Sequence, residues 1–245
     1  MHYNVVRQVE IMTANDFIRL TANAGVLISY HGKKILVDAL HNRYTEVFSA
    51  VPDDLLFSIA HGEGDFENID LIVYTHDHPD HYSSEWTREF LKNHPRTKML
   101  SPIDDFSGER FTVLSAAEET HEYDGIKVKC VRLTHEGEQF REVVNYGFRF
   151  ETDGFSFTVL GDSGPVNIPD VFANADLALY NFPFITLTRG KKMVKELNPK
   201  RIAAYHLPFL QKDKKNYIRA TLRAAECEPR VGTMVLREKD QKEFI

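Results

Sequence analysis

Residues 71–81 read LIVYTHDHPDH, and this stretch decides the fold and the chemistry that the sequence predicts. The run Leu71–Tyr74 is typical of a short, fully apolar strand. A helix is expected to start near Ser83, because a small hydroxyl side chain can cap the free N–H groups of the first helical turn. The polar residues between these two elements therefore lie in a tight turn, which can aim several side chains at one point.

This turn contains three imidazoles and two carboxylates within six residues. Imidazole suits zinc and iron, and carboxylates neutralise the charge of a bound metal ion. The i, i+2 spacing lets His76 and His78 face one metal and leaves Asp77 free to point away. Asp80 and His81 can face a second metal, and two metals about 3.5–4 Å apart form a known hydrolytic arrangement. The sequence thus predicts a dinuclear metal site directly after this strand.

Outward from the turn, short apolar runs alternate with turn signals, of which Asp153-Gly154 is the clearest hairpin signal. Segments 40–68, 102–122 and 182–190 show no motif and are expected to be mainly loops, the first with some helix and the second around the strand at 112–114. Strands that come first and then alternate with helices suggest two packed sheets with helices outside, in one domain of residues 1–245. The predicted strands are 17–20, 26–29, 35–37, 71–74, 98–101, 112–114, 126–134, 146–150, 155–160, 177–180, 202–205 and 233–236, and the predicted helices are 83–94, 190–197 and 213–226.

The HDHPDH segment at residues 76–81 matches the HxHxDH motif of the metallo-β-lactamase superfamily, which the sequence therefore resembles. The early stretch LTANAGVLISYHGKKILVDA at residues 20–39 is also similar to the opening strands of that family, and the resemblance spans roughly residues 17–210. It implies an α/β fold of the four-layer αββα sandwich type, in which two mixed β-sheets pack together with helices outside.

The resemblance also implies three further ligands, each placed after a predicted strand. His135 follows one strand, Asp162 stands in a Gly-Asp-Ser context after another, and His206 follows a third. Taken alone, His135 or His206 is better interpreted as a hydrogen-bonded core residue. Within the family pattern, the implied first metal has His76, His78 and His135, the second has Asp80, His81 and His206, and Asp162 bridges them.

The resemblance implies two catalytic residues, Asp80 and His206, and Asp80 would also take a proton from the nucleophile. Asp38, at the end of an early strand, has two interpretations: it orients a ligand histidine through the free N–H of that ring, or it is a turn carboxylate. The remaining histidines match no motif and are interpreted as surface or structural residues; they are His2, His31, His41, His61, His94 and His121.

Departures within the superfamily narrow the expected activity. Oxygen-reducing flavo-diiron members carry Glu where this chain has His78, and true β-lactamases generally lack an Asp at the position of Asp162. The simplest remaining likeness is to stand-alone members such as the ascorbate-6-phosphate lactonase-like hydrolases. The expected enzyme is a metallo-hydrolase with two divalent metal ions, zinc first with manganese or iron as alternatives. It would cleave an ester, lactone or phosphodiester bond in a small anionic substrate.

Two other functions stay open: a nuclease or phosphodiesterase acting on nucleic acid or nucleotides, and a non-catalytic metal-binding protein. The formal net charge of −6 is not that of a globally basic nucleic-acid binder. Residues 189–223, however, hold eleven lysine and arginine side chains against two acidic ones. This basic segment either attracts an anionic substrate or, the favoured interpretation, forms solvated faces of two helices.

The remaining expectations concern location. No run of 18 apolar residues indicates a membrane span, and the first residues do not resemble a signal peptide. Cys130 and Cys227 do not make a disulfide framework and are interpreted as reduced thiols of a cytoplasmic protein. The sequence does not determine an oligomeric state.

Overall fold

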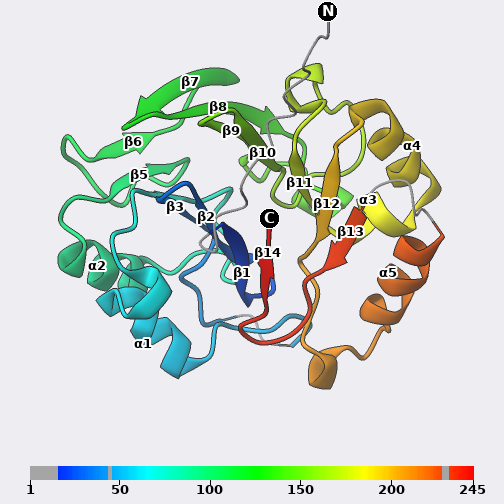
Figure 1. The fold of residues 1–245 in the computed structure, drawn as a ribbon, viewed down its shortest axis with the longest axis horizontal. Helices are drawn as coiled ribbons and strands as arrows, with labels where there is room; N and C mark the ends of the chain where they lie inside the picture. The colour runs from blue at the N-terminus through cyan, green and yellow to red at the C-terminus, as the bar shows by residue number, and fades with distance from the viewer. Residues whose placement is uncertain (1–15, 44–45, 228–231) are drawn as a thin grey trace, which may run out of the picture.

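Two seven-stranded sheets face each other in the computed structural model, which describes residues 16–43, 46–227 and 232–245 (Figure 1). In the first sheet, β1 to β3 form an antiparallel meander, β3 to β6 run parallel, and β14 pairs antiparallel with β1. Its order is β14-β1-β2-β3-β4-β5-β6. The strands are β1 Phe17–Ala22, β2 Gly25–Tyr30, β3 Lys33–Val37, β4 Leu71–Val73, β5 Lys98–Ser101, β6 Phe111–Val113 and β14 Lys242–Phe244.

The second sheet has the same division into an antiparallel and a parallel half. Strands β7 to β10 are antiparallel neighbours, and β10 to β13 are parallel neighbours. Its order is β13-β12-β11-β10-β9-β8-β7. The strands are β7 Glu118–Tyr123, β8 Ile126–Leu133, β9 Asn145–Thr152, β10 Phe155–Val159, β11 Leu177–Tyr180, β12 Arg201–Ala204 and β13 Gly232–Val235.

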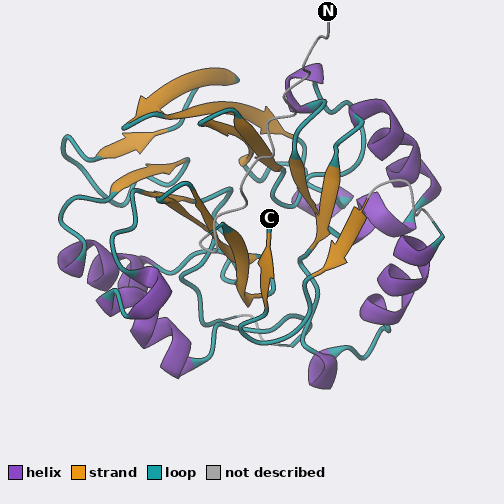
Figure 2. Cartoon of the chain, in the orientation of Figure 1, coloured by secondary structure: helices purple, strands orange, loops and turns teal. Residues whose placement is uncertain are grey.

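Helices cover the outer face of each sheet (Figure 2). Helices α1 Asp53–His61 and α2 Ser84–Asn93 pack their apolar faces on the first sheet. Helices α3 Phe182–Thr186, α4 Thr188–Leu197 and α5 Tyr217–Glu226 lie over the second. The expected four-layer αββα sandwich of two mixed β-sheets is confirmed. Four 3₁₀ turns complete the described elements: η1 Gly64–Phe66, η2 Glu138–Phe140, η3 Asp170–Phe172 and η4 Leu210–Lys212.

The central core lies between the two sheets and is built by alternation along the strands. In β8 the buried and less buried positions alternate over most of its length, so that one face of the strand enters the core. Phe150 and Phe157 stack there at 4.5 Å between ring centroids. Burying each such ring contributes about 1.5–3 kcal/mol, so these aromatic strands hold the two layers together.

The sequence prediction was wrong in several parts, and residues 242–244, which were not predicted as a strand, form β14 beside β1. Residues 118–123, expected within a loop, form edge strand β7, whose polar EETHEY sequence has no apolar alternation to reveal it. Residues 182–190, also expected as a loop, hold α3 and the first turn of α4. The last helix starts at Tyr217 rather than at Asp213, because the Asp213 carboxylate accepts hydrogen bonds from the first backbone N–H groups of α5.

Gly190 allows α4 to pack closely against α3. A Cβ atom at this position would lie 2.1 Å from the Pro183 carbonyl oxygen and 2.6 Å from Phe184 Cα, and both atoms belong to backbone that cannot move easily. Gly190→Ala is therefore expected to lower the free energy of unfolding by at least about 2 kcal/mol. Urea unfolding would measure the loss. Gly232→Ala is the matched control, since no atom lies within 4 Å of its added Cβ; equal stability of the two variants would contradict this packing.

The candidate site lies where four strands end. Strands β8, β10 and β12 run in the same direction within the second sheet, so their carboxyl ends meet at one edge. Strand β4 of the first sheet ends opposite them, because the Tyr146 backbone N–H donates to the Thr75 carbonyl oxygen across the two sheets. None of the described helices is both long and apolar enough to cross a membrane.

Candidate metal centre

Seven side chains predicted from the sequence converge where these four strands end. The structure brings them into two clusters, and within each cluster one nitrogen or oxygen atom per residue lies within 4.8 Å of the others. The first cluster contains His76, His78, His135 and Asp162, and the second cluster contains Asp80, His81 and His206.

The first cluster presents its histidine rings edge to face. His76 Nε2 lies 3.0 Å from His78 Nδ1, and the His135 ring centroid is 5.0 and 4.9 Å from those of His76 and His78. His78 is half-buried, whereas His76 and His135 are buried. Three imidazole nitrogens on one side of a single point are a donor set that suits a divalent transition metal.

In the second cluster, His81 Nε2 and His206 Nε2 face each other at 3.1 Å. The Oδ2 atom of Asp80 lies 3.9 Å from His81 Nε2 and 3.8 Å from His206 Nε2. All three residues are buried. His206 has φ of +57°, so the chain turns sharply at the end of β12, and its backbone N–H donates to the Asn23 carbonyl oxygen.

Asp162 faces both clusters with different oxygen atoms. Its Oδ2 lies 3.7 Å from His135 Nε2 in the first cluster, and its Oδ1 lies 3.0 Å from His206 Nε2 in the second. One carboxylate between two groups of imidazoles has the geometry that a bridging ligand requires. This is the position that the family resemblance implies for Asp162.

Three of the imidazoles are oriented by an acceptor behind the ring. His76 Nδ1 lies 2.9 Å from Thr75 Oγ1, His81 Nδ1 lies 2.9 Å from Asp38 Oδ2, and His135 Nδ1 lies 2.8 Å from the Glu136 carbonyl oxygen. If Nδ1 carries the hydrogen, as these acceptors favour, Nε2 of each ring keeps its lone pair. Each Nε2 then points a lone pair into the cluster, which is the form of histidine that binds a metal.

Asp38 connects two of these rings. Its fully buried carboxylate accepts hydrogen bonds from the Thr75 backbone N–H at 2.8 Å and from Thr75 Oγ1 at 2.7 Å, besides the His81 contact. Because Thr75 Oγ1 donates to Asp38, it is free to accept from His76 Nδ1. Asp38 therefore contacts a candidate ligand histidine directly, which is the geometry that an orienting role requires.

The side chains of the two clusters shift one another's pKa values. Burial opposes a charged ring, but the carboxylates of Asp162, Asp38 and Asp80 outweigh it and raise the pKa of His81 well above its usual value. Burial and then the neighbouring His81 hold the pKa of His76 well below its usual value. Burial would raise the pKa of Asp162, yet His206 and His81 keep this pKa well below its usual range.

The chemistry of the donor set fits metal ions. His135 Nε2 is buried and has no hydrogen-bond partner among the described residues, and no well-aligned hydrogen bond reaches Asp162 Oδ1. Burying a polar atom such as His135 Nε2 unpaired costs free energy, which a bound cation would recover. The residues present therefore fit two divalent ions, one per cluster.

Sequence reasoning missed two asparagines that hold the loop around Asp162. Asn145 Oδ1 accepts from the Asp162 backbone N–H at 3.2 Å. Asn181 Nδ2 donates to the carbonyl oxygens of Gly161 and Ser163, at 3.2 and 3.1 Å. Asn145 is the first residue of β9 and Asn181 directly follows β11, and a polar residue at the end of an apolar run is a signal that sequence analysis could have used.

Two aromatic rings and one further histidine border the clusters and were also missed. Phe140 packs against His78 and His135, at 5.2 and 5.0 Å between ring centroids, and Phe48 packs edge-on against His206 at 4.5 Å. His41 is fully buried, and neither of its ring nitrogens has a hydrogen-bond partner among the described residues. Burial, followed by the charges of His81 and His206, lowers the pKa of His41 well below its usual value.

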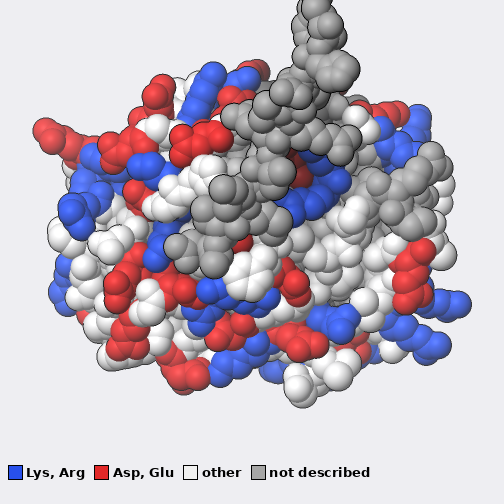
Figure 3. Space-filling view, in the orientation of Figure 1, with Lys and Arg blue, Asp and Glu red and all other residues white. Residues whose placement is uncertain are grey.

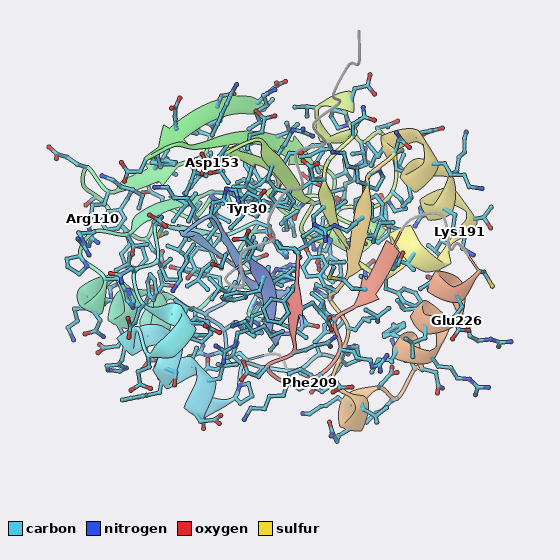
Figure 4. The ribbon with its side chains drawn as sticks, viewed as in Figure 1. Tyr30, Arg110, Asp153, Lys191, Phe209 and Glu226 are labelled. Atoms are coloured by element: carbon cyan, nitrogen blue, oxygen red, sulfur yellow. The ribbon has the colours of Figure 1, made fainter. Side chains whose placement is uncertain are left out.

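The basic segment is distributed over the outer helices. Lys191 lies in the outer layer on α4 (Figure 4) and lines a pocket of about 440 Å³ between helices α3, α4 and α5, which none of the seven cluster residues lines. Arg189 is nearer to the clusters, but it pairs with the Glu136 carboxylate. Acidic and basic side chains also intermingle over the described part of the face in Figure 3. This arrangement favours the solvated interpretation for Lys191.

An αββα sandwich with two His/Asp clusters at its strand ends defines the class of metallo-β-lactamase-fold metal-dependent hydrolases. The chain belongs to this superfamily: the family model described as the beta-lactamase superfamily domain matches residues 18–206. The family is one of metallo-hydrolases, so the expected superfamily and enzyme class are confirmed. None of the curated protein sequences matches the chain.

Solved structures with the same fold include several metal-dependent enzymes. Igni18, a metallo hydrolase from the archaeon Ignicoccus hospitalis, has 16% identity and a TM-score of 0.64, covering 93% of this chain and 97% of that chain. An isothiocyanate hydrolase from Delia radicum gut bacteria has 14% identity and a TM-score of 0.62, covering 94% and 99%. CmlA, a diiron β-hydroxylase from Streptomyces venezuelae, has 14% identity and a TM-score of 0.61, covering 95% and 55%. At these identities the likeness concerns the fold alone.

Proposed function

We propose that this protein hydrolyses an ester, lactone or phosphodiester bond in a small anionic molecule, with two divalent ions in the two clusters. The observation that carries the proposal is the placement of Asp162, whose two carboxylate oxygens face different clusters. Such a bridge brings two ions close enough to act on one substrate. Zinc is the proposed ion because imidazole dominates both clusters, with manganese or iron as alternatives.

The proposed ligands divide as the clusters do. His76, His78 and His135 would hold one ion, Asp80, His81 and His206 the other, and Asp162 would bridge them. The ions, when bound, supply a water of lowered pKa and polarise the bond that is cleaved. Asp38 keeps the His81 ring in the orientation that ligation needs.

Side chains of the protein itself position the substrate and move the proton in this proposal. Asp80 lies in the second cluster with its carboxylate near His206 and would accept the proton of the attacking water. Phe140 and Phe48 stand on opposite clusters and would exclude bulk water from the cleavage point. A drier site strengthens every electrostatic interaction with the substrate.

Charge balance supports an anionic substrate. Two divalent ions would bring four positive charges to three carboxylates, those of the ligands Asp80 and Asp162 and of Asp38 behind His81, so the loaded centre keeps a net positive charge. This positive charge would attract an anionic substrate without help from the basic segment 189–223. The substrate class of the ascorbate-6-phosphate lactonase-like members agrees with it, and that likeness remains part of the proposal. We also propose a cytoplasmic location, because the free thiols of Cys130 and Cys227 persist in a reducing compartment.

The first test is hydrolysis of bis(p-nitrophenyl) phosphate beside a panel of small lactones and thioesters, with Zn²⁺ and Mn²⁺ supplied separately. We expect metal-dependent turnover of at least one substrate, and chelation should reduce its rate on the order of 10³-fold or more. Turnover of the phosphodiester alone would favour a nucleotide or nucleic-acid substrate. Equal rates in metal-free and metal-loaded protein would overturn the proposed mechanism.

A further inference from the structure

The turn between β1 and β2 reaches the second cluster from the opposite side of the site. Asn23 in this turn is fully buried, and its Nδ2 atom lies 3.2 Å from Asp80 Oδ2 and 3.5 Å from His206 Nε2. Its backbone carbonyl oxygen accepts the His206 N–H at 3.0 Å. A residue far from the HDHPDH segment in sequence thus touches two of the three members of the second cluster.

The orientation of the Asn23 amide follows from its partner. An ionised carboxylate only accepts hydrogen bonds, so the NH₂ group of Asn23, not its oxygen, faces Asp80. Within the described residues, this is the one hydrogen bond that the Asp80 carboxylate accepts. The bond ends on Oδ2, the same oxygen that faces both His81 and His206, and a carboxylate oxygen has a second lone pair left for a metal.

The local backbone is built to hold Asn23 in this place. Its φ of +34° lies in the left-handed region, which Asn tolerates better than most residues. Gly25 allows the turn to approach the strand end that carries Asp38, since an added Cβ would lie 2.9 Å from the Asp38 carbonyl oxygen and from Ala39 Cα. The turn is therefore pressed against the same segment that orients His81.

We propose that Asn23 is a positioning residue for the second metal: its amide fixes the Asp80 carboxylate while its carbonyl oxygen fixes the His206 backbone. This inference rests on the proposed metal function. Without the amide, Asp80 is free to rotate away from the shared ligand position, and only the second cluster loses a ligand. The first cluster has its own orienting contacts, from Thr75 Oγ1 and the Glu136 carbonyl oxygen, and does not depend on Asn23.

The test variant is Asn23→Gly, which removes the amide and accepts the left-handed backbone without strain. Zn²⁺ is titrated into metal-free protein by calorimetry, and Co²⁺ is titrated with visible absorption as a second probe. Wild-type protein is expected to bind two ions. In the variant, one ion should bind with unchanged affinity and the other about 10–100-fold more weakly.

Asn68→Gly is the matched control, because Asn68 also has a left-handed backbone, with φ of +55°, but precedes β4 at the end away from the clusters. It should bind both ions as the wild type does. A merely structural role for Asn23 would weaken both ions together and lower the melting temperature of the metal-free variant well below that of the control.

The outcomes separate this inference from the proposed function. If wild-type protein binds two ions and Asn23→Gly binds both with the same affinities, the role of Asn23 is refuted and the metal centre stands. Equal weakening of both ions would also refute it. If wild-type protein binds one ion or none, the second metal site that Asn23 would serve does not exist, and the dinuclear proposal fails with it.

Discussion

The Asp162→Ala variant is expected to lose hydrolytic activity on the order of 10³-fold or more, beyond the 10–100-fold typical of a residue behind the ligands. Removing this carboxylate takes an oxygen from each cluster at once, since Oδ2 faces His135 and Oδ1 faces His206. Both proposed ions lose a ligand and the link that sets their separation. Steady-state rates, with metal content measured on the same samples, check this result.

The fold should survive this substitution. The loop around Asp162 is held by its backbone, since its N–H donates to Asn145 Oδ1 and its carbonyl oxygen accepts from the Glu136 N–H at 2.7 Å. None of these bonds needs the carboxylate. The variant should therefore unfold at a denaturant concentration close to that of metal-free wild-type protein.

Asp176→Ala is a control that is expected to lower stability and to leave metal binding and activity unchanged. The Asp176 carboxylate holds the Ser156 N–H at 2.7 Å and the Lys200 ammonium in the second sheet, away from both clusters. Its loss should cost about 1.5–3 kcal/mol of stability while metal content and activity per folded molecule stay the same. Full activity in Asp162→Ala, or loss of metal in Asp176→Ala, would contradict the assignment of the site.

The placement of Asp162 also shows how far the sequence alone reaches. The apolar runs predicted most of the strands, because fully buried strands such as β4 must be continuously apolar. The HDHPDH turn indicated a metal site because its histidines are close together in sequence. His135 and His206 stand alone after their strands, so only the family pattern connected them with the turn, and the structure brings them to the same point.

Other parts of the site left no signal in the sequence. The side chain of Asn23 meets Asp80 and His206 only through packing of the β1–β2 turn across the molecule, and asparagine in a turn is commonplace. His41 was interpreted as surface or structural, and it is fully buried close enough to His81 and His206 to feel their charge. Edge strand β7 escaped prediction since its polar side chains do not alternate with apolar ones. Local sequence patterns do not reveal contacts between residues distant in sequence, nor strands that lack an apolar face.

Metal removal is expected to produce the largest change in stability. Ions that bind the folded chain alone, at about 1,000 times their dissociation constant, stabilise it by about 4 kcal/mol per site. For a chain of this size, each kcal/mol raises the melting temperature by about 2–4 °C, so two sites correspond to a rise of about 15–30 °C. Thermal unfolding of chelator-treated protein, with and without added Zn²⁺, measures this shift.

The buried clusters explain why the shift should be large. Within the described residues His135 Nε2 lacks a hydrogen-bond partner, and the carboxylates of Asp38, Asp80 and Asp162 crowd around the His81 ring, whereas bound ions would satisfy both clusters at once. His81→Ala should reduce the rise by about half, because it removes a ligand of the second cluster only. His121→Ala is the matched control: His121 pairs with Glu119 on the edge strand, outside both clusters, and should keep the full response. A melting temperature that Zn²⁺ does not change in wild-type protein would mean that the converging histidines are a hydrogen-bonded core and not a metal centre.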